Sequence, residues 1–231
     1  MEHNEEKLVQ ETPATETESK SFPKKLWRQS RNNKTYRMVL LATLFALIVV
    51  LQIWGSSIPF FAGTSLCLVL IPIVIGGLAL GVKAGALLGI FFGVFVFFWN
   101  GVFGLAGMSD TLTPFLYNAK PLFTFAVCVI KGFAAGFFPA LFHRVFCKKT
   151  PFVSVVISAA LAPICNTSLF LIGMFIIFST LESFTLSIGM SAGYFLTAII
   201  LVNFTVELAI NLITAPAIYR VAQVIARRKL H

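Results

Sequence analysis

The stretch LIPIVIGGLALGVKAGALLGIFFG, residues 70–93, decides the fold class of this chain. It is apolar on both sides of a short break, GVKAG at 81–85, in which Lys83 lies among glycines. Glycine readily adopts the backbone conformations of turns, and a lysine is costly inside a membrane. The break therefore favours a tight turn over one very long helix. The stretch predicts two successive apolar helices of a membrane bundle.

The composition gives the same indication for the whole chain. Of its 231 residues, 58% are hydrophobic and 12% are charged, and the mean hydropathy is +0.89. Soluble domains are nearer one quarter charged. We therefore predict an all-α integral membrane protein. In such a protein, the net charge of +9 indicates orientation in the membrane rather than binding of nucleic acid.

Six segments are long and apolar enough to span a bilayer, which takes about 20 residues. These segments are 37–55, 65–82, 84–104, 119–146, 151–180 and 188–220. We expect residues 36–231 to form one six-helix transmembrane domain. Residues 1–35 are polar and rich in Glu, Thr and Lys, which is typical of a disordered tail, and they lack the early apolar core of a cleavable signal peptide.

The basic residues predict the orientation of the bundle. Fifteen lysines and arginines fall at one set of predicted helix ends, while the opposite set holds only Lys120, with the acidic Asp110 and Glu182. Basic residues concentrate on the cytoplasmic side of membrane proteins. We therefore expect a protein of the cell membrane with both termini in the cytoplasm, which requires an even number of helices.

Small residues at helical spacing predict close helix contacts. Gly85, Gly89 and Gly93 share one helical face, and Gly132 and Gly136 share another. Small residues four positions apart let helix backbones approach closely, so we expect these glycines to pack inside the bundle. The first span has a weaker pair in LATLFAL, formed by Ala42 and Ala46. Packing inside the bundle is one explanation for this pair, and a smooth patch in the cytoplasmic half is another.

Only two charged residues, Lys131 and Glu207, lie inside the predicted spans. Each precedes a basic anchor, Arg144 or Arg220, by 13 residues, and Asn166 follows Lys149 by 17 residues on a helix that runs the other way. At 1.5 Å per residue, all three fall about 20–25 Å from the cytoplasmic end. We therefore expect Lys131, Asn166 and Glu207 to meet at one depth.

The segment LVNFTVELAINL, residues 201–212, adds a polar stripe at this depth. Asn203, Glu207 and Asn211 lie four residues apart and share one helix face, which should point inward because lipid offers amides and carboxylates no partners. With aromatic walls such as Trp99, Tyr117 and Phe123, this suits a pocket for a small polar molecule.

Two other functions of the polar residues stay open. A buried Lys131–Glu207 ion pair can simply lock helices together. A titrating carboxylate can also serve a proton relay in a self-contained secondary transporter, although no internal inverted repeat is evident.

The chemistry that is missing excludes several classes. The sequence has no GxxxxGK[ST] phosphate loop, no HExxH motif and no GxSxG elbow, so we expect neither ATP binding by this chain nor enzyme activity. The four cysteines form no CxxC pair and the three histidines lie far apart, so we expect no metal site and no cofactor.

Several motifs together resemble the S components of energy-coupling factor (ECF) transporters, the membrane subunits that bind substrate in vitamin importers. The resemblance covers nearly the whole chain after residue 35. It lies in six spans with both ends inside, in ATLFA of the first span, and in the IP-containing helix, turn and Gly-rich helix of 70–93. APICNTSLFLIGM is similar to the family's fifth helix, and NFTVELAINLITAPAIYR to its sixth.

The resemblance implies partners and a mechanism. S components dock on a membrane coupling subunit that two cytoplasmic ATPases drive, and an AxxxA face of the first helix makes the contact, which points to Ala42 and Ala46 here. The loaded subunit then topples in the membrane and releases substrate inside. The resemblance also implies that Lys131, Asn166 and Glu207 contact the ligand.

The substrates of the family are mostly B vitamins and their precursors. A lysine in the pocket favours a ligand with a carboxylate, while Glu207 can accept hydrogen bonds from hydroxyls or amides. Pantothenate has both kinds of group and is the leading expectation; riboflavin, folate, biotin and hydroxymethylpyrimidine stay open. A scaffold or assembly factor without any small-molecule ligand is the remaining class.

Overall fold

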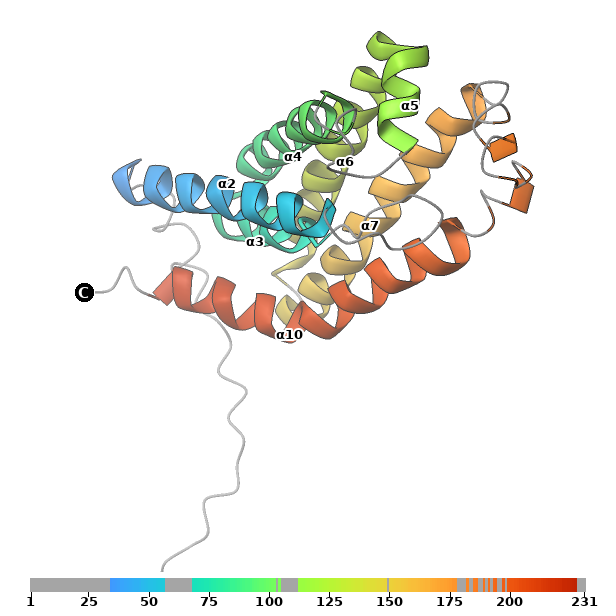
Figure 1. Ribbon diagram of the computed structural model, residues 1–231. Coiled ribbons are helices and arrows are strands. Elements are labelled where there is room, and N and C mark those ends of the chain that lie inside the picture. The colour runs from blue at the N-terminus through green and yellow to red at the C-terminus, as the bar shows by residue number, and fades with distance from the viewer. Residues whose placement is uncertain are drawn as a thin grey trace, which may run out of the picture.

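The computed structural model describes residues 34–56, 68–102, 104, 112–148, 150–177 and 199–227, with isolated positions between 182 and 197. All regular structure in this part of the chain is helical (Figure 1). The predicted disordered tail lies outside the described residues, except that its last two positions, 34 and 35, already belong to the first helix.

Nine helical elements of the described residues follow one another along the chain. They are α2 (Lys34–Ser56), α3 (Leu70–Leu80), α4 (Val82–Val96), the π-helix η1 (Phe97–Val102), α5 (Leu112–Ala119), α6 (Pro121–Phe146), α7 (Pro151–Ile176), the π-helix η3 (Ile199–Phe204) and α10 (Thr205–Arg227). The described part of the segment 105–118 contains most of α5.

Five helical segments are long and apolar enough to cross a membrane: Thr35–Ser56, Val82–Gly101, Pro121–Phe146, Pro151–Ile176 and Val202–Ile225. The second predicted span, 65–82, appears among the described residues only as α3, an apolar helix of 11 residues. Such a helix rises about 17 Å, roughly half of a 30 Å hydrocarbon layer. The chain is thus a multi-pass membrane protein by its helices, and the predicted count of six is not confirmed.

The predicted turn between residues 81 and 85 is confirmed. Gly81 separates α3 from α4 with a φ of 99°, a left-handed conformation that glycine adopts without steric cost. Its N–H donates to the carbonyl of Gly77 at 3.0 Å and so caps the end of α3. The two halves of the opening stretch therefore fold back on each other as separate helices.

The predicted glycine contacts are confirmed between α4 and α6. A Cβ added at Gly89 would overlap the carbonyl group of Gly132, and one added at Gly136 would overlap that of Gly85. Gly93 meets the backbone of Cys128 in the same way. The two backbones therefore touch directly.

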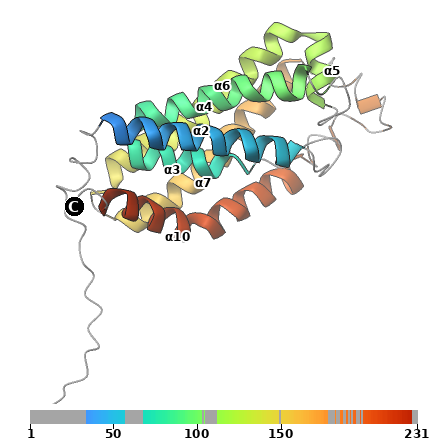
Figure 2. The same ribbon diagram turned by 60° about the vertical axis from the view of Figure 1, so that its left-hand side comes forward.

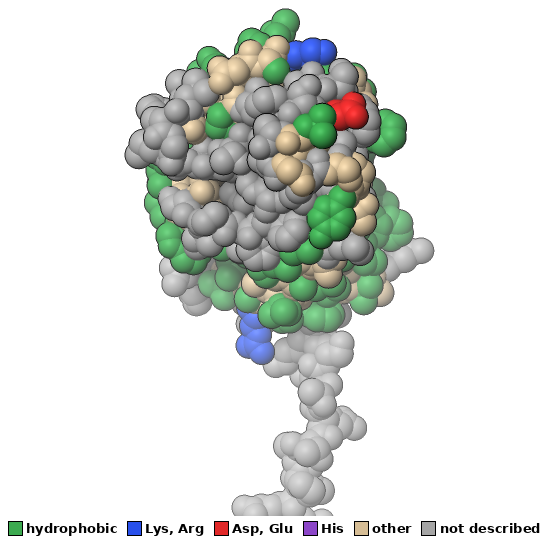
Figure 3. All heavy atoms as spheres, turned by 45° about the vertical axis from the view of Figure 1, so that its right-hand side comes forward, with side chains coloured by type: hydrophobic (Ala, Val, Ile, Leu, Met, Phe, Trp, Pro, Cys, Tyr) green, Lys and Arg blue, Asp and Glu red, His purple; other side chains and the backbone are tan. Residues whose placement is uncertain are grey.

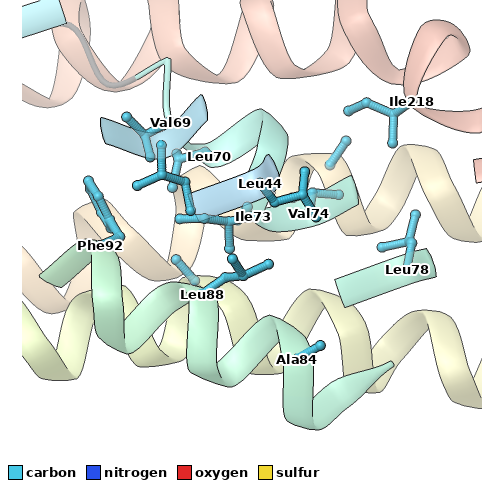
Figure 4. Packing of buried hydrophobic residues seen from close by; sticks show 14 of the residues in the cluster. Leu44, Val69, Leu70, Ile73, Val74, Leu78, Ala84, Leu88, Phe92 and Ile218 are labelled. Carbon is cyan, nitrogen blue, oxygen red and sulfur yellow. The ribbon is translucent and has the colours of Figure 1, made fainter. Parts of the chain in front are cut away.

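The core lies where α2, α3, α4 and α10 converge. Ile48, Ile73, Leu88, Phe92 and Ile218 are all at most 1% exposed. Figure 4 shows residues of this cluster, among them Ile73, Leu88 and Phe92, gathered between the helices. Large apolar side chains also cover the outside of the helices, among them Met38, Leu122, Phe175 and Ile213. A surface of this kind suits contact with lipid.

The basic residues mark one end of the bundle. α2 begins and α10 ends at the same end, and the direction alternates along the series α2, α3, α4, α6, α7 and α10 (Figures 1 and 2). Arg37 and Lys83 lie in the first turns of α2 and α4, and Arg144 lies in the last turn of α6. Arg220 lies about two turns before the end of α10. Figure 3, turned toward the opposite end, shows mainly apolar and uncharged side chains in the described part. The predicted separation of charge is therefore present in the fold.

Candidate functional site

The polar stripe of 201–212 spans the junction of η3 and α10. Asn203 lies in the π-helix, and its Nδ2 donates to the Glu207 carboxylate at 3.5 Å. Asn211 Nδ2 donates to the Glu207 carbonyl oxygen at 2.8 Å. Glu207 and Asn211 are 3% and 1% exposed, so the stripe faces the interior. Single π-helical turns within α-helices are frequent at functional sites.

Asn166 lies near the level of this stripe on the neighbouring helix α7. The rings of Phe152 on α7 and Tyr219 on α10 lie 5.4 Å apart and fix the register of these two antiparallel helices. Fourteen residues outward from this contact, Asn166 on α7 comes level with Thr205 on α10. Viewed along the axis of α7, Asn166 and Phe152 differ in direction by only about 40°, so they lie on the same side of the helix. It is 6% exposed.

Lys131 shares the level of Asn166. His143 on α6 hydrogen-bonds Ser154 on α7, and Ser158 Oγ donates to the Pro139 carbonyl oxygen at 2.9 Å. Eight residues outward from the Pro139–Ser158 contact, Lys131 lies opposite Asn166. Counted from these contacts by helical rise, the lysine, the α7 amide and the α10 stripe fall at similar depths on three different helices.

No ion pair joins Lys131 to Glu207 among the described residues. The Lys131 ammonium instead lies 4.9 Å from the centroid of the Phe170 ring, one turn from Asn166 on α7. α6 and α10 both pack on α7 and share no comparable interface with each other. The structure therefore does not support the interpretation of these two charges as a structural ion pair.

Three amide oxygens on α7, η3 and α10 are buried without a hydrogen-bond donor from the described residues. They are the Oδ1 atoms of Asn166, Asn203 and Asn211. Most buried polar groups in proteins have a partner, and the exceptions require an explanation such as a water, an ion or a ligand. These oxygens make the region where α7 meets η3 and α10 the candidate site.

Two of the three aromatic residues predicted to line the pocket lie around η1, and the third, Phe123, belongs to α6. Trp99 stacks on Phe95 with ring centroids 6.1 Å apart, and Tyr117 on α5 contacts Phe97 at 5.4 Å. η1 packs on α4, α5 and α6, and has no comparable interface with α10. Trp99 and Tyr117 therefore belong to an aromatic group around η1. Their contact with a ligand stays a prediction.

The sequence analysis missed a buried polar network between α2 and η1. Gln52 Nε2 donates to Ser56 Oγ at 2.8 Å and to Asn100 Oδ1 at 3.4 Å, and Ser56 Oγ donates to the same oxygen at 3.1 Å. The available signal was the four-residue spacing of Gln52 and Ser56 in an apolar span, which puts them on one helix face. The network ties the end of α2 to the π-helix that carries Trp99.

Ala42 and Ala46 lie on the exposed face of α2. The buried face of the same helix carries Leu44, Ile48 and Gln52. The two alanines therefore do not serve packing inside the bundle, which removes that explanation of the AxxxA pair. They form, with exposed residues such as Leu47, a smooth apolar strip on the outside of the molecule.

No group of three metal-binding side chains occurs among the described residues. Comparison with known proteins adds no assignment: no family model matches this chain, and no curated protein matches it. The fold and the site alone define a multi-pass helical membrane protein with a buried polar level.

Proposed function

We propose that this chain is the substrate-capture subunit of an ATP-driven ECF importer for a small water-soluble vitamin or vitamin precursor. The observation that carries the proposal is the polar level inside an otherwise apolar bundle. Glu207, Asn166 and Asn211 are at least nine-tenths buried there, and amide oxygens lack donors from the described residues.

The cost of this arrangement argues for a ligand. A buried acceptor without a donor costs about 1–3 kcal/mol, and charged or polar groups within membrane helices generally serve transport or binding. Leucine in place of Asn166 or Asn211 would avoid that cost. Packing alone does not require these amides, whereas a bound solute would satisfy their oxygens.

The exposed alanines support a partner in the membrane. Ala42 and Ala46 face away from the bundle, and small residues allow another helix to approach closely. In the proposal, this strip docks on a coupling subunit, and two cytoplasmic ATPases supply the energy. The absence of a phosphate loop in this sequence fits such a division of labour.

A self-contained proton-coupled transporter is the second candidate. The buried carboxylate of Glu207 favours it, since such groups act in proton relays. The two candidates differ in one property: the capture subunit binds substrate tightly but transports nothing alone, whereas the transporter drives uptake in liposomes under a pH gradient without other proteins.

The first test is a thermal-shift screen of the purified chain against the water-soluble vitamins, without ATP. One vitamin, with pantothenate as the leading expectation, should raise Tm, and liposomes containing the chain alone should show no uptake under a pH gradient. Uptake by the chain alone would establish the secondary transporter instead, and the absence of any binding ligand would favour a scaffold.

The second test addresses the docking strip. Ala42→Trp and Ala46→Trp should leave vitamin binding intact and abolish ATP-driven uptake, because a bulky ring prevents close helix approach. Ile213→Trp is a matched control, since Ile213 is 77% exposed on α10. If binding and uptake fell together in the alanine variants, or if Ile213→Trp stopped uptake equally, the assignment of the strip would be wrong.

A further inference from the structure

The three amide oxygens also indicate what kind of ligand the site takes. An amide oxygen offers two acceptor positions, and Oδ1 of Asn166, Asn203 and Asn211 receives no hydrogen bond from the described residues. Asn166 and Asn211 are 6% and 1% exposed, so bulk water does not satisfy their oxygens. The chemistry of the site is therefore decided by which atoms these amides present.

The hydrogen bonds of the stripe fix the orientation of two amides. An Asn side chain can in general be turned over, exchanging its oxygen and nitrogen. Asn211 Nδ2, however, donates to the Glu207 carbonyl oxygen, and Asn203 Nδ2 donates to the Glu207 carboxylate. Turning either amide would set oxygen against oxygen, so both keep their acceptor atoms free for a ligand.

The neighbouring charges make this a patch for hydrogen-bond donors. The Glu207 carboxylate belongs to the same stripe and is 3% exposed. The positive charge of Lys131 lies over the Phe170 ring, one turn further along α7 than Asn166. A ligand carboxylate or phosphate placed at the stripe would thus face the oxygen lone pairs of the amides and of Glu207, whereas N–H groups would find acceptors.

We propose that the patch formed by Asn166, Asn203, Glu207 and Asn211 selects its ligand through N–H groups of an amine, an amino-substituted ring or an amide. The inference rests on the proposed capture function and names the ligand group that this site recognises. Any carboxylate of the same ligand points away from the α10 stripe, so an acidic group is neither required nor sufficient for binding.

The test uses the ligand-free protein and the vitamin that raises its Tm, with nicotinamide against nicotinate and pyridoxamine against 4-pyridoxate as matched probes. Asn166→Leu and Asn211→Leu each replace the amide by an apolar group with the same number of heavy atoms and so remove its acceptor. Both should weaken binding about tenfold or more. Asn166→Leu should leave the Tm of the ligand-free protein equal to or above that of the parent, because it removes an unsatisfied polar atom.

Thr214→Val is the matched control. Thr214 lies one turn from Asn211 on α10, and its hydroxyl donates within the helix, to the carbonyl oxygens of Ile210 and Asn211. This variant should bind with parental affinity. A lowered Tm in Asn166→Leu with unchanged affinity would assign the amide to packing and overturn the proposal.

The remaining outcomes separate this inference from the proposed function. A tightly bound vitamin without N–H groups, or one whose affinity survives both leucine variants, would overturn the inference and leave the capture function standing. If sodium chloride alone raised Tm and Asn211→Leu abolished this effect, the site would bind an inorganic cation. That result would also overturn the inference. If no vitamin or probe bound, both proposals would fail together.

Discussion

At the scale of single residues, the decisive feature is that Lys131 and Glu207 share a depth without forming an ion pair. The lysine interacts with the Phe170 ring, and the carboxylate takes part in the hydrogen-bonded stripe of α10. A sequence shows how far each residue lies from its basic anchor, so the shared depth was predictable. It does not show which rotamer a long side chain adopts, so the partner of Lys131 was not.

This arrangement predicts that the two charges contribute independently to stability. The changes in the free energy of unfolding that Lys131→Met and Glu207→Gln cause separately should add up in the double variant, within about 0.5 kcal/mol. Such additivity is expected of residues that do not interact directly. A double-mutant cycle on the ligand-free protein in detergent, followed by thermal unfolding, measures the coupling. A coupling energy of several kcal/mol between the two residues would instead support the interpretation as a structural ion pair.

At the scale of elements, the sequence predicted contacts best where they depend on backbone shape. The turn at Gly81 and the glycine faces of α4 and α6 follow from local rules, and the structure contains both. The π-helices η1 and η3 were not predictable, because an extra residue in one helical turn leaves no periodic signal in a short apolar segment. The network of Gln52, Ser56 and Asn100 was missed because its partners lie 44 to 48 residues apart.

The α4–α6 contact should be the least tolerant of added volume. Gly132→Leu would drive a side chain into the backbone of Gly89 and should cost about 3 kcal/mol of stability. Ala126→Leu on the same helix adds a side chain at an exposed position and should change Tm little. Thermal unfolding of both variants checks this. Equal stability of the two variants would contradict the direct backbone contact.

At the scale of the whole molecule, the basic end of the bundle should face the cytoplasm. Lys148 and Glu182 are both exposed; Lys148 follows the end of α6, and Glu182 belongs to the segment after α7, at the opposite end. In a chain with Cys67, Cys128, Cys147 and Cys165 replaced by Ala, a membrane-impermeant maleimide should label Glu182→Cys in intact cells. Lys148→Cys should react only in inverted vesicles. The reverse pattern would contradict the orientation that the charges predict.

The central claim is that the buried polar level binds a small solute. Isothermal titration of the purified protein and its Glu207→Gln variant, with the vitamin that raises Tm, tests it most directly. The carboxylate should account for about 1–3 kcal/mol of binding, so we expect Kd to rise about 5- to 150-fold. An unchanged Kd with a lowered Tm would contradict the claim and make Glu207 a structural residue.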